Sequence, residues 1–164
     1  PEQRDPGGAY FQLARAHREL GETEEEIVVL TRLTELSPDA TAAFERLMQL
    51  GADRKDWPKV IAQAANFSAV DPLQPAPHRF TGEASEALGN KPGAIAAYRT
   101  LLKLDPPDPS EIHYRLARLL HEGGDPLAKR HLLMALEEAP RFRAAHALLL
   151  EINDKPSPKP RVTP

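Results

Sequence analysis

The spacing of its prolines constrains this chain more than any other feature. The sequence contains 17 prolines, and proline interrupts helices because it lacks a backbone N–H and fixes φ. Four of them, Pro38, Pro72, Pro106 and Pro140, follow one another at intervals of 34 residues. A fixed period of this length predicts an array of structural repeats.

Apolar residues keep the same register before each of these prolines. The positions eight residues earlier hold Leu30, Ala64, Tyr98 and Leu132. The positions five residues earlier hold Leu33, Phe67, Leu101 and Ala135. Apolar residues at this spacing line one face of a helix, so we expect a helix that ends near each proline.

Capping residues predict where these helices begin. Asp56, Asn90 and Asp125 can each accept a backbone hydrogen bond as an N-cap, with a proline within the next two residues. In the first copy Thr23 and Glu26 match a capping box. A second amphipathic helix precedes each of these starts and ends at a glycine in three copies, at Gly21, Gly89 and Gly123-Gly124. Each period therefore predicts two antiparallel helices.

This helix-turn-helix repeat resembles the tetratricopeptide repeat (TPR) family over about residues 7–154. The third copy matches best. Its small contact positions are Gly82 and Ala94, its turn glycine is Gly89, and its aromatic position is Tyr98. The resemblance implies an all-α, right-handed superhelical solenoid of about four repeats with a C-terminal capping helix.

The period divides the chain into segments. We expect a flexible N-terminal segment over 1–6, a TPR domain over 7–154 and a disordered proline-rich tail over 155–164. Within the domain we expect repeats at about 7–40, 41–74, 75–108 and 109–140, and a capping helix at 141–154. In the capping helix Phe142, Ala145, Leu148 and Leu149 or Ile152 should pack against the last repeat.

Composition limits the classes of partner. A net charge of −3 gives no cationic field for nucleic acid or anionic lipid, so a protein or peptide is the expected partner. No apolar run is long enough to insert into a membrane. The absence of cysteine fits a cytoplasmic or a periplasmic soluble protein, so the compartment stays open. The chain begins without methionine, and we expect it to be a piece of a longer protein.

The resemblance implies a concave groove lined mainly by the first helix of each repeat. Phe11 and Tyr114 are the predicted apolar anchors, and arginines can pair with carboxylates of a partner. The predicted partner-binding residues are Phe11, Arg15, Arg18, Glu45, Gln49, Arg79, Glu83, Tyr114 and Arg118. Charges at this helical spacing also suit a solvated face, and that alternative stays open.

No motif in the sequence predicts catalysis, a cofactor or a metal. No two of the six histidines lie four residues apart, and no phosphate-binding loop or nucleophile elbow occurs. Trp57 follows a predicted turn, so we expect it to pack between helices rather than to stack on a ligand.

Three hypotheses for the function follow. The main hypothesis is a non-catalytic scaffold or adaptor that binds a protein segment in the groove. The alternative is a regulatory or substrate-positioning appendage of a larger multi-domain enzyme, because residues 128–152 resemble repeats appended to bacterial envelope proteins. A third hypothesis is self-association through the last helix or the tail.

Overall fold

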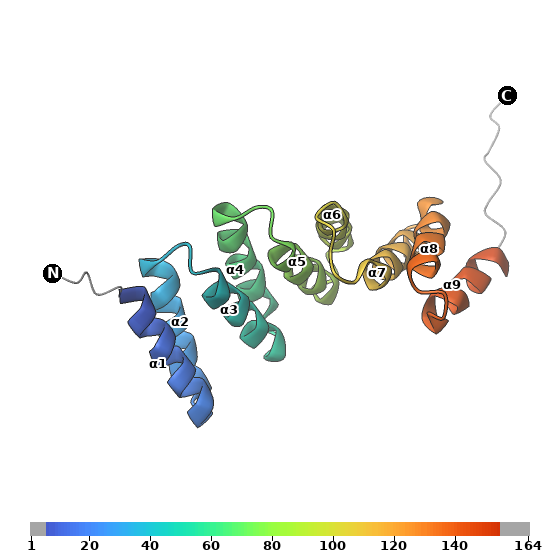
Figure 1. The fold of residues 1–164 in the computed structure, drawn as a ribbon. Coiled ribbons are helices and arrows are strands. Elements are labelled where there is room, and N and C mark those ends of the chain that lie inside the picture. Colours follow the sequence, from blue (N-terminus) through green and yellow to red (C-terminus); the bar gives the residue numbers. More distant parts are fainter. Residues whose placement is uncertain (1–5, 155–164) are drawn as a thin grey trace. The chain divides into compact units, whose positions relative to one another are not determined.

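A computed structural model describes residues 6–154, and these residues form nine α-helices and no strand (Figure 1). The helices are α1 (Pro6–Leu20), α2 (Thr23–Leu36), α3 (Thr41–Asp53), α4 (Trp57–Val70), α5 (Pro75–Ala87), α6 (Lys91–Leu102), α7 (Pro109–Glu122), α8 (Leu127–Glu138) and α9 (Arg143–Asp154). The helices α3, α5, α7 and α9 begin at residues 41, 75, 109 and 143, so successive starts differ by 34 residues. The predicted all-α helical-repeat solenoid is confirmed.

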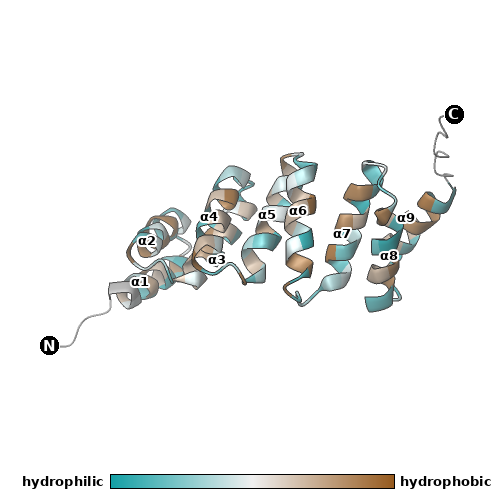
Figure 2. Cartoon of the chain, turned by 90° about the horizontal axis from the view of Figure 1, so that it is seen from above, coloured by the Kyte–Doolittle hydropathy of each residue, from teal (hydrophilic) through white to brown (hydrophobic). Residues whose placement is uncertain are grey.

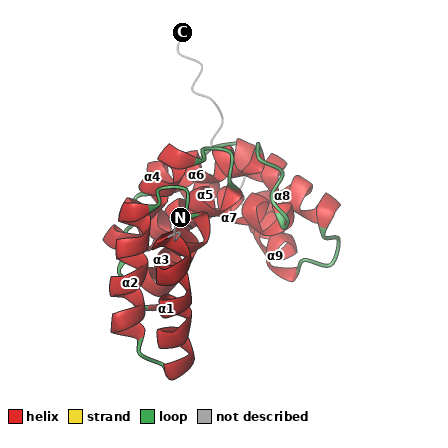
Figure 3. Cartoon of the chain, turned by 60° about the vertical axis from the view of Figure 1, so that its left-hand side comes forward, coloured by secondary structure: helices red, strands yellow, loops and turns green. Residues whose placement is uncertain are grey.

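The helices form two compact units, one that extends to Leu104 and one that starts at Asp105. In the first unit each helix from α1 to α6 packs against the next one along the chain. Short loops join them (Figure 3). Each helix carries hydrophobic and hydrophilic residues (Figure 2), and the hydrophobic ones supply the buried clusters between neighbouring helices.

Two clusters form the core of the first unit. One joins α1, α2 and α3 through Ala14, Val29, Leu30, Leu33, Ala43, Leu47 and Leu50. The other joins α3, α4 and α5 and includes Phe44 and Phe67, whose ring centroids lie 5.8 Å apart. Trp57 packs at the edge of this second cluster. The predicted role of Trp57 in inter-helix packing is confirmed.

Gly82 lets α5 and α6 approach closely. A β-carbon at this position would clash with the ring of Tyr98, which is fully buried. The Tyr98 hydroxyl donates a hydrogen bond of 2.6 Å to Oε1 of Glu86 on α5, so the buried ring keeps its polar atom satisfied. The small residue and the aromatic residue of the third repeat thus form one contact.

Side chains cap several helices as predicted. Asp56 accepts a hydrogen bond from the backbone N–H of Lys59, and Asn90 accepts one from that of Gly93. Gly89 has a φ of 72°, a backbone conformation that glycine adopts without a β-carbon penalty.

Two predicted caps differ from the structure. The N-cap of α8 is Pro126 and not the predicted Asp125, which lies one residue before the cap. Asp125 still accepts a hydrogen bond from the backbone N–H of Leu127. The Thr23–Glu26 capping box is wrong. The N-cap of α2 is Glu22, which makes no side-chain cap bond, and the carboxylate of Glu26 pairs with a residue of α3 instead.

The second unit holds α7, α8 and α9. Its core includes Ala117, Leu132, Ala135 and Ala145. Partly buried residues surround this core, among them Leu148, Leu149 and Ile152 of α9 and Phe142, which directly precedes α9. The predicted packing face of the capping helix is confirmed.

The domain boundaries and the superhelical hand stay predictions. Residues 1–5 of the expected flexible segment and the whole expected tail, 155–164, lie outside the described residues.

Candidate functional site

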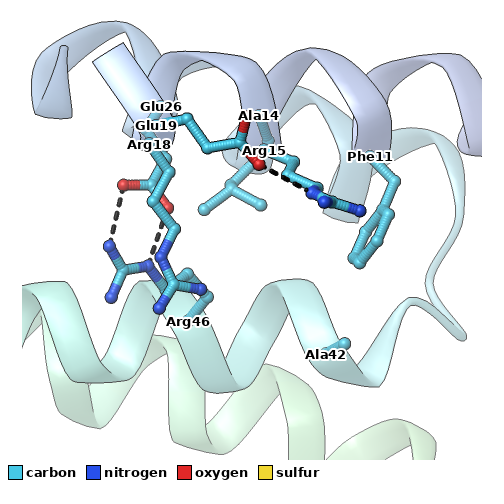
Figure 4. Close-up of a pocket in the computed structure, with 9 residues that line it drawn as sticks. Phe11, Ala14, Arg15, Arg18, Glu19, Glu26, Ala42 and Arg46 are labelled. Carbon is cyan, nitrogen blue, oxygen red and sulfur yellow. Dashed lines mark hydrogen bonds and ion pairs between the residues drawn. The ribbon is translucent and has the colours of Figure 1, made fainter. Parts of the chain in front are cut away.

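A groove in the first unit lies between α1, α2 and α3 and has a volume of roughly 460 Å³ (Figure 4). Its lining combines apolar side chains with three arginines and two glutamates. The lining residues are Phe11, Ala14, Arg15, Arg18, Glu19, Glu26, Leu30, Ala42 and Arg46.

A buried carboxylate anchors one wall of the groove. Glu26 on α2 is only 3% exposed and accepts two hydrogen bonds from Arg46 on α3, with Nε–Oε1 and Nη2–Oε2 distances of 2.7 and 2.9 Å. These hydrogen bonds raise the pKa of the Arg46 guanidinium above its ordinary value. The parallel, two-bond geometry is the strong form of an arginine–carboxylate contact. This contact holds α2 against α3, and the Arg46 side chain lines the groove.

The arginines of α1 differ in how they are paired. The Nε of Arg15 donates to Glu19 at 3.0 Å on an exposed part of the helix. Arg18 is exposed, and no carboxylate among the described residues pairs with it. Its side chain extends from α1 towards α3, where Arg46 binds Glu26 (Figure 4). The groove therefore has one positive charge that no carboxylate within residues 6–154 neutralises.

A second, more open groove continues from α3 to α5 with a volume of roughly 310 Å³. Arg18, Glu45, Arg46, Gln49, Arg79 and Phe80 are among its lining residues. The guanidinium carbon of Arg79 lies 4.5 Å from the centroid of the Phe80 ring, and its Nη1 lies 3.8 Å from Oε1 of Glu83. Gln49 donates to Asp53 at 2.9 Å. Arg18 and Arg46 line both grooves.

The structure thus brings six of the predicted partner-binding residues to adjoining grooves. They are Phe11, Arg15, Arg18, Glu45, Gln49 and Arg79. Glu83 contacts Arg79 beside the second groove. Tyr114 and Arg118 lie on α7 in the second unit. Tyr114 is partly buried, and its ring centroid lies 5.0 Å from that of Phe142, so it contributes to packing there.

Sequence reasoning missed Glu26 and Arg46 as groove residues. A signal was present in the sequence, because the equivalent positions one and two periods later hold the apolar residues Val60 and Ala94. The structure shows that both of these residues are fully buried. A glutamate at a position that is apolar in the other repeats requires a cationic partner when it is buried. Only the packing of α2 on α3 identifies that partner as Arg46.

A pair of histidines in the second unit was also missed. The Nδ1 atoms of His113 on α7 and His131 on α8 lie 3.0 Å apart. The centroids of the two rings lie 5.2 Å apart. This distance is what two rings give when their Nδ1 atoms point at each other, so the contact is an edge-to-edge hydrogen bond that needs one neutral imidazole. Burial lowers the pKa of His113, and the charge of Glu138 opposes this shift.

The part of the chain that the structure describes has no group of three or more His, Cys, Asp or Glu arranged to hold a metal ion. None of the helices within residues 6–154 is long and apolar enough to cross a bilayer.

Comparison with known proteins identifies the family. Two family models, both described as tetratricopeptide repeat, match the chain: one at residues 7–40, the other at residues 56–109 and 81–140. The chain belongs to the tetratricopeptide repeat family. Members of this family are generally non-catalytic modules for protein–protein interaction, and the predicted family is confirmed. A search of curated protein sequences found no match.

Several solved TPR structures resemble this one. A crystal structure of MamA protein has 18% sequence identity to this chain and a TM-score of 0.78. The match covers 90% of this chain and 82% of the MamA chain. TTC0263, a thermophilic TPR protein from Thermus thermophilus, is 20% identical over 94% of this chain and 84% of its own, with a TM-score of 0.62. A chain of the APC/C hetero-tetramer Cut9-Hcn1 is 22% identical over 88% of this chain and 29% of its own, with a TM-score of 0.66. At these identities the likeness establishes the fold.

Proposed function

We propose that this TPR protein is a non-catalytic adaptor that binds an extended segment of a partner protein in the grooves of its first unit. The observation that carries the proposal is the exposed Arg18, which no carboxylate among the described residues pairs with and which lies beside the apolar side chains of the groove. A partner carboxylate would neutralise that charge. The family's general role in protein–protein interaction supports the same class of partner.

The neighbourhood of Arg18 favours a carboxylate over a cation. Both carboxylate oxygens of Glu26 already accept a hydrogen bond from Arg46, and Glu19 accepts one from Arg15. Among the described residues, Arg18 is the cation of this groove that no carboxylate holds in place. Because guanidinium groups bind carboxylates through two parallel hydrogen bonds, the contact would also fix the orientation of the bound segment.

Phe11 supplies the second contact. It precedes Arg18 by seven residues, which is about two helical turns or about 10 Å along α1. Both side chains therefore project from the same face of the helix. A segment in the polyproline II conformation advances about 3.1 Å per residue with three residues per turn, so an apolar residue three positions from an Asp or Glu lies on the same side about 9 Å away and would reach both side chains.

Selection from a random peptide library displayed on phage tests the proposal with no partner known in advance. The unaltered protein should enrich peptides with an acidic and an apolar residue about three positions apart. R18E should lose affinity for these peptides by tenfold or more, because it puts a carboxylate against a carboxylate. The matched control is R99E, which reverses the charge of an exposed arginine on α6.

The outcomes separate clearly. Enriched peptides that bind R18E and R99E equally well would contradict the assigned groove. Enrichment of basic peptides, or binding that 0.5 M salt leaves unchanged, would contradict the assigned charge of the partner, since contacts of exposed charges are screened by salt.

A further inference from the structure

The outer face of α1 carries an apolar stripe that no part of the described chain covers. Its residues are Ala9, Leu13, Ala16 and Leu20, and all four are exposed. Leu13 is 46% and Leu20 is 72% exposed. The spacing of four, three and four residues places them along one line on the helix, as in the seam of a coiled coil. The stripe lies on the side of α1 that faces away from Phe11, Arg15 and Arg18.

The repeat period shows what such a stripe does elsewhere in the first unit. The residues of α3 one period after Ala9, Leu13 and Ala16 are Ala43, Leu47 and Leu50. All three are buried in the cluster that they share with Val29, Leu30 and Leu33 of α2. The stripe of α1 is therefore equivalent to a surface that an amphipathic helix covers in the next repeat.

The stripe of α1 is longer than its counterpart on α3. Position 54, one period after Leu20, holds Arg54, whose Nη2 pairs with Oε1 of Glu24 at 2.8 Å. On α1 a leucine replaces this arginine and lengthens the apolar stripe by one turn.

We propose that the stripe is a self-association surface, at which α1 of one copy packs antiparallel against α1 of a second copy. A twofold axis between positions 14 and 15 places Leu13 against Ala16 of the second copy and Leu20 against Ala9 of the second copy. Each large side chain then meets a small one, so both helices can approach closely. A surface that pairs with itself in this way gives a closed, symmetric dimer.

The flanks of the stripe suit the same arrangement. In an antiparallel pair Gln12 faces Glu19 of the second copy, and Tyr10 faces His17 of the second copy. The first contact joins an amide donor to a carboxylate, and no two like charges meet. This surface is distinct from the last helix and the tail that the sequence indicated for self-association, and it leaves the Arg18 groove open.

One helix pair buries less area than a standard protein interface, so the dimer should be weak and concentration-dependent. Sedimentation equilibrium of the full chain from about 10 µM to about 1 mM should show a monomer–dimer equilibrium. L20E should weaken association at least tenfold. The matched control is L73E, because Leu73 is 73% exposed in the loop before α5 and loses the same side chain. A monomer at all concentrations, or equal effects of L20E and L73E, would overturn the proposal.

Cysteine cross-linking tests the geometry independently, since the natural sequence contains no cysteine. An oxidised mixture of L13C and A16C proteins should form a disulfide-linked dimer. L20C alone should not, because the two copies of position 20 lie about 16 Å apart along an antiparallel pair. Rapid cross-linking of L20C alone would show a parallel pair and refute this arrangement. Circular dichroism of each variant at 222 nm checks that its helices are intact.

Discussion

The contact between Glu26 and Arg46 gives a quantitative prediction. Replacing Arg46 by methionine leaves the carboxylate of Glu26, which is 3% exposed, without its two hydrogen bonds. Removing one partner of a buried ion pair costs about 3–5 kcal/mol. The Arg46 side chain is 26% exposed, so water can reach the edge of the pair. We therefore expect R46M to lower the free energy of unfolding by about 2–3 kcal/mol, at or below the bottom of that range.

Urea unfolding followed by tryptophan fluorescence measures this effect in the first compact unit, which contains both Glu26 and Arg46. The chain has one tryptophan, Trp57, and it packs against the cluster that joins α3, α4 and α5. With a slope of about 2 kcal/mol per molar urea, the midpoint of R46M should fall by about 1–1.5 M. The control R15M breaks a pair whose side chains are 67% and 65% exposed. That variant should change the free energy of unfolding by less than about 0.5 kcal/mol.

A double variant tests the physical reason. E26V with R46M removes both charges and gives position 26 the valine that Val60 supplies one period later. An apolar pair of similar volume can equal or exceed a buried ion pair in stability, so this variant should lie within about 1 kcal/mol of the parent or above it. If the double variant is as unstable as R46M, the cost does not come from an unpaired carboxylate and the reasoning is refuted.

Three further predictions concern packing, capping and pH. Gly82→Ala should destabilise the first unit by about 2 kcal/mol or more in the same assay, because its methyl group clashes with Tyr98; a neutral effect would contradict the close contact. Asp56→Ala should cost about 1 kcal/mol through the lost N-cap, while Asp56→Asn should recover most of it. Burial lowers the pKa of His113, so folding favours its neutral form and stability should fall as the pH drops below about 6.5. The melting temperature by circular dichroism should therefore fall more between pH 7.5 and 5.5 in the parent than in H113Q, and equal falls would contradict this.

Much of the fold could be predicted because its signals are local. The 34-residue proline period, the apolar positions before each proline and the N-caps at Asp56 and Asn90 are all visible in the sequence. Each depends on residues within one or two helical turns. The positions of Gly82 and Tyr98 in the repeat pattern could be predicted in the same way, but only the packing of α5 on α6 shows that the two residues contact each other.

The candidate site was predicted less completely because its contacts join different helices. The faces of α1 and α3 could be projected from helical periodicity, and this placed Phe11, Arg18 and Gln49 on the grooves. Helical periodicity could not predict which charged side chains form ion pairs with one another. Glu26 fitted a capping motif within its own helix, but it binds Arg46, which lies 20 residues away in the sequence.

The sequence by itself determined the class of fold, the length of the repeat and the ends of most helices, because helix periodicity and capping are properties of short segments. The tertiary structure decided which charges neutralise one another and which stay available. Within the described residues it buried Glu26 against Arg46 and left Arg18 unpaired. It also left Leu13 and Leu20 exposed on α1, although the equivalent Leu47 is buried. The physical reason is that desolvation depends on which surfaces meet, and only the packing of helices distant in sequence sets that.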